Sequence, residues 1–409
     1  MIGRRAFSAG LALAACRAPK WEDGRRIVTL WFSYGGKNRE VLLDLVRKFN
    51  VRQTNVVVKA TYQGDYFESL AKLRTALAAN AAPTFSHVVG EVVPYLDHAG
   101  VLEPLDDHVP ANDLVRPLAQ SGAFEGGDVH PLVAIPFNRS TPIMLVNGAV
   151  QDAERFETPR TWDELTDVAK RLTRDGRWGY EVPISWWFWV ALVGQAGGKL
   201  LENDDPILGG DAGVRALRFW QGLVHVHRVM RPPAGRDYNA WNATNQDFLA
   251  GRAPIIWTST AFLRYLEENA KFPVRAAPLP RGVRESVPTG GTFFVVLRAA
   301  PIEEKEGAYA FLRFMCEPEQ TIEWATRTGY MPVTQPAIDR LRSEGWYRSH
   351  PNDDVAILQL RSAQPWPWAR TLFRIQREIV EPRLEDAVFS NRDAEAVMNE
   401  ARVVARRRK

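Results

Sequence analysis

The sequence predicts an α/β protein of two lobes. Three observations lead to this prediction: a length of 409 residues, a hydrophobic content of 45% with 11% aromatics, and an alternation of strand-like and helix-like segments. A chain of this length exceeds one comfortable hydrophobic core, because chains beyond about 250–300 residues divide into domains. The apolar residues are numerous enough to fill two such cores.

The first half of the chain alternates strands and helices. Apolar runs predict the strands, and helical spacing of apolar residues predicts the helices between them. Asp65 and Glu68 form a capping box at the start of the second helix. Such an alternation is typical of a parallel sheet covered by helices, and its ligands bind beyond the carboxyl ends of the strands. The predicted strands occupy residues 25–32 and 55–62, a further strand with a turn occupies residues 84–93, and the helices occupy residues 38–50 and 65–80.

The second half continues with the same kinds of segment. Thr161 and Glu164 predict another capping box, and Gly290 with Gly291 opens an apolar strand. Beyond about residue 335 the pattern is mostly helical, and the chain ends in a basic tail at residues 401–409. The remaining predicted helices occupy residues 158–176, 211–229, 261–272, 303–316 and 318–329, and the strands residues 252–260 and 290–297.

One stretch, "PFNRSTPIMLVN" (residues 136–147), interrupts two strand-like runs with polar side chains. Asn138 to Thr141 supply four hydrogen-bonding side chains in a row, and Pro142 follows them. A turn between two strands accounts for this pattern. A strand that crosses from one lobe to the other, with its polar middle facing a ligand, accounts for it equally well.

The formal net charge of +4 arises at the two ends of the chain. Seven basic residues lie in the first five and last eight positions, and without them 45 basic residues stand against 48 acidic ones. The body of the protein is therefore close to neutral. This balance argues against a nucleic-acid-binding surface.

The first residues, "MIGRRAFSAGLALAAC", form a targeting signal. A basic start is followed by an apolar run too short to span a bilayer, and small residues end at Cys16. This pattern resembles a lipoprotein signal, in which residues 1–16 contain the leader and Cys16 carries the lipid; a disordered terminus with a chance cysteine is the alternative. Arg4 and Arg5 resemble a twin-arginine signal, so the export route stays open. The other cysteine, Cys316, is expected to be a buried thiol.

No familiar catalytic motif occurs in the chain. There is no phosphate-binding loop, no His-Glu-x-x-His, no Cys-x-x-Cys and no nucleophile elbow. His225 and His227 are two positions apart in a predicted helix, so their side chains point in different directions and do not suit one metal. We therefore expect a binding protein without a metal or cofactor, rather than an enzyme.

Candidate binding residues lie where predicted strands end. Four bulky aromatic residues also gather in "SWWFW" (residues 185–189), and they cannot all face one way on a helix. At least one tryptophan there is expected to be exposed, where it suits stacking on a sugar or a quaternary ammonium; core packing is the alternative. The candidates at strand ends are Tyr66, Glu91, Ser140, Ser259, Gly291 and Tyr330.

Several stretches resemble the extracellular solute-binding proteins of ABC importers, most closely the members that bind glycerol 3-phosphate. They are "PFNRSTP", "TWDEL", the glycine pair before an apolar strand, and "TGYMPVT" followed by "IDRLRSEGWYRSHP". The resemblance runs from about residue 28 to about residue 400. It implies the two-lobe periplasmic-binding-protein fold of type II, in which mostly parallel sheets close on a ligand about a hinge, and it favours the interlobe crossing at residues 138–142.

The resemblance also implies a ligand set. It assigns ligand contacts to Tyr66, Glu91, Ser140, Ser259, Gly291 and Tyr330, with Gly90 as the competing match for Glu91. Arg377 aligns with a phosphate-binding arginine when "IVEPRLE" (residues 379–385) sets the register, and a pair with Glu381 one helical turn away is its alternative role. Trp187 represents the tryptophans of residues 186–189 in the expected cleft.

The family pattern leaves the ligand open. "SWWFW", Thr260 and Phe262 depart from it and suggest a larger head group, so we expect glycerol 3-phosphate or a glycerophosphodiester such as glycerophosphocholine. A sugar or oligosaccharide is the alternative, and an exported hydrolase a remote one. We expect a monomer that is lipid-anchored in the periplasm or on the outer face of the cell membrane and that delivers its ligand to permease subunits. The expected lobes are residues 26–139 with 290–333, and residues 140–289 with 334–400.

Overall fold

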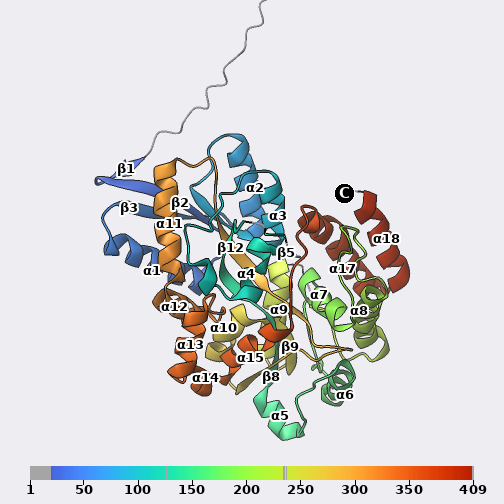
Figure 1. Ribbon diagram of the computed structural model, residues 1–409. Coiled ribbons are helices and arrows are strands. Elements are labelled where there is room, and N and C mark those ends of the chain that lie inside the picture. Colours follow the sequence, from blue (N-terminus) through green and yellow to red (C-terminus); the bar gives the residue numbers. More distant parts are fainter. Residues whose placement is uncertain (1–19, 126–127, 130, 234, 236, 408–409) are drawn as a thin grey trace, which may run out of the picture.

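The computed structural model describes residues 20–125, 128–129, 131–233, 235 and 237–407. Its elements form two main β-sheets with helices packed against them (Figure 1). No helix among the described residues is long and apolar enough to cross a membrane. Cys16 lies outside the described residues.

The first sheet contains six strands, in the order β1-β2-β4-β12-β7 with β3 paired to β2. They are β1 (Trp21–Glu22), β2 (Arg25–Phe32), β3 (Val56–Tyr62), β4 (Phe85–Val89), β7 (Ile135–Ser140) and β12 (Gly290–Val296). β2 is parallel to β3 and β4, whereas β12 is antiparallel to both β4 and β7. Four strands therefore point one way, which is the predicted mostly parallel arrangement, with β12 reversed between them.

Both faces of this sheet are buried, because its side chains alternate between two cores. In β12, Phe294 and Val296 join one hydrophobic cluster, and Phe293 and Val295 join another. This is the period-two pattern of a strand between helical layers. The surrounding helices are α1 (Gly36–Arg52), α2 (Tyr66–Ala78), α3 (Val93–His98), α4 (Arg116–Ala123), α11 (Ile302–Cys316) and α12 (Pro318–Thr328).

The second sheet is smaller and has the order β10-β8-β9. Its strands are β8 (Pro142–Asn147), β9 (Ile255–Ser259) and β10 (Val274–Ala277), and β8 is antiparallel to both neighbours. Parallel bridges of Glu181 with Ile256 and of Tyr180 with Met230 extend it beyond β9. All segments except β8 therefore share one direction, so each sheet has one reversed strand in its interior.

Helices also cover the second sheet on both faces. Met144 and Trp257 join the largest hydrophobic cluster, while Ile143 and Ile256 join a separate one on the other face. The helices of this half are α5 (Gly148–Glu154), α6 (Trp162–Leu172), α7 (Trp186–Gln195), α8 (Asp211–Gln221), α9 (Asp237–Leu249), α10 (Leu263–Asn269), α13 (Gln335–Ser343), α14 (Trp346–Ser349) and α15 (Pro351–Gln359). The helix predicted at residues 211–229 changes at Gly222 into a π-helical turn, η3 (Gly222–Val226).

The stretch "PFNRSTPIMLVN" does connect the two sheets. β7 belongs to the first sheet and β8 to the second, and Thr141 alone separates them. Residues 278–289 return from β10 to β12, and residues 329–334 lead from α12 toward α15, which packs against β10. We call residues 140–142, 278–289 and 329–334 the three crossing segments.

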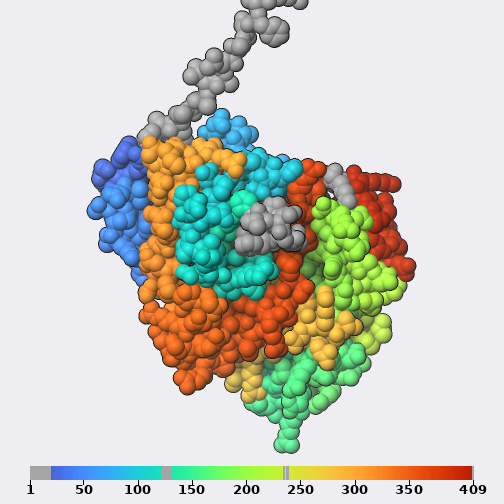
Figure 2. All heavy atoms as spheres, viewed as in Figure 1, coloured from blue at the N-terminus to red at the C-terminus, as the bar shows by residue number. Residues whose placement is uncertain are grey.

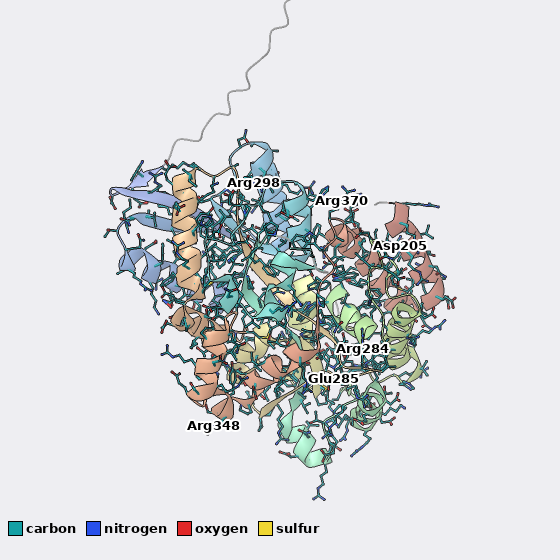
Figure 3. All side chains as sticks on the ribbon, viewed as in Figure 1. Asp205, Arg284, Glu285, Arg298, Arg348 and Arg370 are labelled. Carbon is teal, nitrogen blue, oxygen red and sulfur yellow. The ribbon has the colours of Figure 1, made fainter. Side chains whose placement is uncertain are left out.

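The C-terminal end of the chain is ordered further than the predicted tail. After α16 (Leu372–Arg374), the π-turn η6 (Ile375–Val380) and α17 (Glu381–Ser390), the helix α18 (Ala394–Arg407) continues through the predicted boundary at residue 401. Its apolar face explains this, because Ala401 and Ala405 are buried in the core of the second half. Arg406 also pairs with Asp205 at 2.6 Å, near the position labelled for Asp205 in Figure 3.

Residues 366–377, which we call the bridging segment, reach back from the second half to the first. Phe373 packs 5.7 Å from Phe67 between ring centroids, and Arg370 is 3.0 Å from the Nε2 atom of His98. Arg370 lies between the blue helices of the first half and the red C-terminal helices (Figure 3). In Figure 2 red-orange atoms fill the space between the teal and light green surfaces. This contact joins the predicted second lobe to the first.

Candidate functional site

A cavity of about 440 Å³ is lined by residues from both halves of the chain. It brings together seven of the eight predicted ligand-binding residues: Tyr66, Glu91, Ser140, Trp187, Ser259, Gly291 and Tyr330. Its volume lies within the range of about 300–1,000 Å³ that is typical of small-molecule sites. The sequence therefore placed seven of its eight predicted ligand residues in the wall of one cavity, although these residues span positions 66 to 330.

The predicted residues meet because each one lies at the end of an element. Tyr66 is the first residue of α2 and lies within the Asp65–Glu68 capping box, which the structure confirms. Ser140 ends β7 and Ser259 ends β9, and Ser259 pairs with Pro142, two residues after Ser140. Glu91 lies in the short 3-10 turn η1 (Gly90–Val92) that follows β4.

The main chain is tightly packed at Gly291. Its φ is +98°, and a Cβ atom there would lie 1.7 Å from the carbonyl oxygen of Asn138. Glycine is therefore required, because a larger residue would push β12 away from β7. Asn138 holds this junction together: its Oδ1 accepts from the Thr292 backbone N–H at 2.7 Å, and its Nδ2 is 3.4 Å from the hydroxyl oxygens of Tyr66 and Tyr330.

Acidic groups are prominent in the cavity wall. Asp65, Glu91 and Glu381 line it, and among the described residues its lining includes no lysine or arginine. Burial raises the pKa of Glu91 to about 7; nearby Arg139 lowers it and Glu381 raises it further. Glu91 thus changes charge near neutral pH, and the wall carries hydrogen-bond acceptors for hydroxyl or cationic groups.

Arg377 is the predicted residue that the structure places outside the cavity lining. Its guanidinium pairs with Glu381 at 2.9 Å and stacks on the Phe67 ring, 3.8 Å from the ring centroid. Opposite charges one helical turn apart attract each other, which explains why the Arg377 side chain lies against Glu381. Because Phe67 and Glu381 both line the cavity, Arg377 lies directly behind the wall. A direct phosphate contact by Arg377 would require its side chain to move.

The aromatic cluster at residues 185–189 is divided between core and cavity. Phe188 and Trp189 are fully buried, whereas Trp187 is partly exposed and lines the cavity together with Trp186. This confirms that the four rings do not all face the core. A Cβ atom on Gly290 would lie 2.7 Å from the Trp187 ring, so the ring packs closely against the first residue of β12.

Sequence reasoning missed several residues of the wall. Tyr34 follows β2, Trp241 lies in α9 and Gln376 lies in the bridging segment. Ser33 and Tyr34 directly follow a predicted strand, as several of the predicted ligand-binding residues do. Their position after a strand could therefore have identified them from the sequence. No comparable signal marks Trp241 or Gln376, because their place depends on how α9 and η6 pack.

Five buried polar atoms around the cavity have no hydrogen-bond partner among the described residues. Buried polar groups are nearly always paired, so these atoms are exceptions, although their burial keeps them from contacting a ligand in the cavity as it stands. The aromatic and acidic side chains of the wall suit a small, polar molecule. The five atoms are Ser33 Oγ, Tyr34 Oη, Ser185 Oγ, Trp186 Nε1 and Trp187 Nε1.

Other features do not compete with this cavity as a site. Among the described residues no group of three or more histidine, cysteine or acidic side chains could hold a metal ion. Cys316 is buried and free, and burial raises the pKa of its thiol to about 12, which makes it unreactive.

Residues 44–352 match the family of bacterial extracellular solute-binding proteins. The chain belongs to this family. Among curated relatives, the sn-glycerol-3-phosphate-binding periplasmic protein UgpB of Escherichia coli O1:K1 is 24% identical over 388 residues, covering 90% of this chain and 86% of UgpB. The UgpB of Pectobacterium atrosepticum is 23% identical over 362 residues, covering 84% and 81%.

Solved structures of solute-binding proteins share the fold. UgpB from Mycobacterium tuberculosis, in complex with glycerophosphocholine, superimposes with a TM-score of 0.81 at 23% identity, covering 92% of this chain and 97% of that protein. Maltose-bound MalE3 of T. maritima gives a TM-score of 0.82 at 19% identity, covering 94% and 100%. This solute-binding protein therefore has the two-lobe fold that the sequence predicts.

Proposed function

We propose that this solute-binding protein is the substrate-binding subunit of an ABC importer and that its ligand is a glycerophosphodiester or glycerol 3-phosphate. The observation that carries the proposal is the single cavity in which Tyr66, Ser140, Ser259, Gly291 and Tyr330 converge from both halves of the chain. Hydroxyl groups and a close backbone approach suit the neutral part of a phosphate site. The likeness to UgpB proteins supports the same ligand class.

A diester with a cationic head group fits the remaining wall best. The carboxylates of Glu91 and Glu381 suit glycerol hydroxyls or a cation, and the faces of Trp187 and Trp241 suit a quaternary ammonium. Glycerol 3-phosphate alone offers no group for these aromatic faces. Glycerophosphocholine combines the phosphate, the glycerol and the cation in one molecule.

A sugar is the second candidate, and the lining itself favours it. Aromatic faces and carboxylates are suited to stacking on sugar rings and accepting from their hydroxyls, and the described lining includes no arginine or lysine. Maltose or an oligosaccharide would then lie along Trp187, Trp241 and Phe262. The two candidates differ in charge, so titration separates them.

Calorimetric titration with glycerol 3-phosphate, glycerophosphocholine and maltose tests the proposal. We expect glycerophosphocholine to bind most tightly, and saturation by maltose with no heat from either phosphate ligand would overturn the phosphate assignment. Incubation with glycerophosphocholine, followed by analysis for free choline, tests the expectation that the protein is not an enzyme. Release of choline at a rate proportional to protein concentration would contradict it and support the exported hydrolase.

The lobes and the closing motion are part of the same proposal. Residues 26–139 with 290–333 would form one lobe, residues 140–289 with 334–400 the other, and the three crossing segments the hinge between them. We further propose export, attachment of lipid at Cys16, action as a monomer and docking to permease subunits. A glycerol phosphate or sugar is the only ligand in this scheme, without a metal, cofactor or nucleic acid.

A further inference from the structure

Arg139 lies at the meeting point of the three crossing segments. It precedes Ser140 in "PFNRSTP", and the residue is only 1% exposed. Its carbonyl oxygen accepts from the Met331 N–H at 2.8 Å. Its guanidinium donates to the Gly291 carbonyl at 3.0 Å and to the Thr289 hydroxyl at 2.7 Å. One residue therefore contacts all three connections between the halves.

The charge of Arg139 is buried without a carboxylate partner. Within the described residues its two hydrogen-bond acceptors are neutral, its Nε has no hydrogen-bond partner, and it forms no ion pair. The guanidinium instead lies over the Phe293 ring, 4.4 Å from the centroid. Arginine stays charged in proteins, and an unpaired buried charge is costly. Such a charge calls for a compensating anion nearby, and the carboxylate of Glu91 acts on Arg139 without forming an ion pair with it.

The cavity lies on the other side of the residues that Arg139 holds. Gly291 and Ser140 line the cavity, and Arg139 is bonded to the first and adjacent in sequence to the second. Burial lowers the pKa of Arg139 to about 10, and the charge of Glu91 in the cavity wall opposes that change. The two groups therefore interact through a poorly solvated region, where charges act over longer distances than in water.

We propose that Arg139 is a positioning residue that gives the cavity its preference for an anionic ligand, although it does not line the cavity. Its buried charge would attract a phosphate held against Gly291, Ser140 and Tyr330, and its bonds would fix the Gly291 peptide. Asn138 holds the other side of that peptide, through the Thr292 N–H. This inference rests on the proposed phosphate ligand.

A comparison with Arg377 shows why Arg139 is the better source of this potential. Arg377 is paired with the carboxylate of Glu381 at 2.9 Å, and its side chain is 28% exposed to water. Water screens exposed charges strongly, whereas the charge of Arg139 is buried and forms no ion pair within the described residues. We therefore expect removal of the Arg139 charge to affect anion binding even if Arg377 is intact.

Two neutral variants and one charged variant test the proposal in the full-length protein. Arg139→Met and Arg139→Gln remove the charge at similar length, and Arg139→Lys keeps it. We expect the neutral variants to bind glycerophosphocholine at least about tenfold more weakly, with maltose affinity unchanged, and Arg139→Lys to stay within a few-fold of the native value. Equal weakening for both ligands, or loss of phosphate affinity in Arg139→Lys, would overturn the proposal. If the neutral variants do not fold, Arg139→Lys alone decides.

A matched control and a ligand-free measurement complete the test. Arg264→Met removes another mostly buried arginine, paired with Glu267 and Asp353, and should lower the melting temperature without changing the preference between ligands. Carbon NMR titration of Glu91, identified with Glu91→Gln, should show a higher pKa for Glu91 in Arg139→Met than in the native protein. An unchanged pKa would refute the electrostatic role. A native protein that binds maltose but no phosphate ligand would instead remove the proposed ligand.

Discussion

Arg377 stacks on Phe67, with its guanidinium carbon 3.8 Å from the ring centroid, and so joins the bridging segment of the second half to α2 of the first. The same guanidinium pairs with Glu381, and both partners line the cavity. A ligand phosphate in the cavity would compete with the carboxylate of Glu381 for the guanidinium of Arg377. This relationship makes Arg377 the first residue to test.

Arg377→Ala should weaken the binding of glycerophosphocholine by at least about tenfold, which corresponds to about 1.4 kcal/mol. The change removes a cation behind the cavity wall and leaves Glu381 without this partner. Arg377→Lys should recover only part of the affinity, because lysine cannot offer a planar pair of donors. Calorimetric titration of each variant measures the effect.

Arg374→Ala is the matched control for Arg377. Arg374 lies one turn earlier, is exposed and is 3.7 Å from Glu378. Its loss should leave the affinity unchanged. Unaltered binding of every phosphate ligand by Arg377→Ala would exclude a phosphate role for Arg377 and shift the weight toward a sugar stacked on Trp187.

Gly290→Ala should destabilise the protein by about 1–3 kcal/mol, because the added methyl group overlaps the Trp187 ring. The nearest ring atoms would lie 2.7 and 2.8 Å from the new Cβ atom. In a Trp187→Ala background the same change should cost little, since the ring is gone. Denaturant unfolding of the single and double variants measures this coupling.

Gly222→Ala serves as the control for Gly290→Ala. A Cβ atom there meets nothing within 4 Å, and its neighbour residues are helical. We expect its free energy of unfolding to be equal to the native value or slightly higher. Equal destabilisation by Gly290→Ala with and without Trp187 would show that the ring is not the cause.

The stability of the protein should fall between about pH 5 and pH 8, in part because of Glu181. Burial and then the charge of Asp247 raise the pKa of Glu181 to about 8 from the ordinary value of 4.5. The folded state therefore binds more protons than the unfolded state in this window, and its advantage is lost as pH rises toward the folded pKa. Glu181→Gln, which resembles the protonated acid, should flatten the decline in melting temperature.

The raised pKa of Glu91 acts in the same pH window, so the melting temperature of Glu181→Gln should still decline with pH, but less steeply than that of the native protein. Adding Glu91→Gln should flatten it further. Glu285→Gln is the control, because Glu285 is exposed and pairs with Arg361 on the surface at 3.3 Å. A Glu181→Gln variant whose melting temperature follows the native curve at every pH would contradict the raised pKa of Glu181.

Cys16→Ser should release the protein from membranes into the soluble fraction, because serine cannot take the lipid. Bacterial lipoproteins carry more than one acyl chain, which is what stable anchoring requires. Fractionation of cells that express each form, together with mass spectrometry of the mature N-terminus, measures the outcome. A variant that stays with the membranes as the native protein does would show that the lipoprotein interpretation is wrong.

Local patterns in the sequence determined the elements and their order. The apolar run at residues 25–32 became β2 with the same bounds, and the capping box at Asp65 began α2 as predicted. These features depend on neighbouring residues alone, so a single sequence contains them. The crossing at "PFNRSTP" was predicted as one of two alternatives. A polar break between two strands is visible in the local sequence, whereas the strands with which each of them pairs are not.

Tertiary structure decided which side chains face the cavity. Trp187 lines it while Trp189 is buried, although both lie in one helix, because α7 packs Trp189 against α8 and leaves Trp187 against Gly290. The side chain of Arg377 contacts Glu381 and Phe67, and the buried side chain of Arg139 donates to the Gly291 carbonyl. Each outcome depends on contacts between residues far apart in sequence, and the energies of those contacts exist only once the two sheets and the bridging segment have come together.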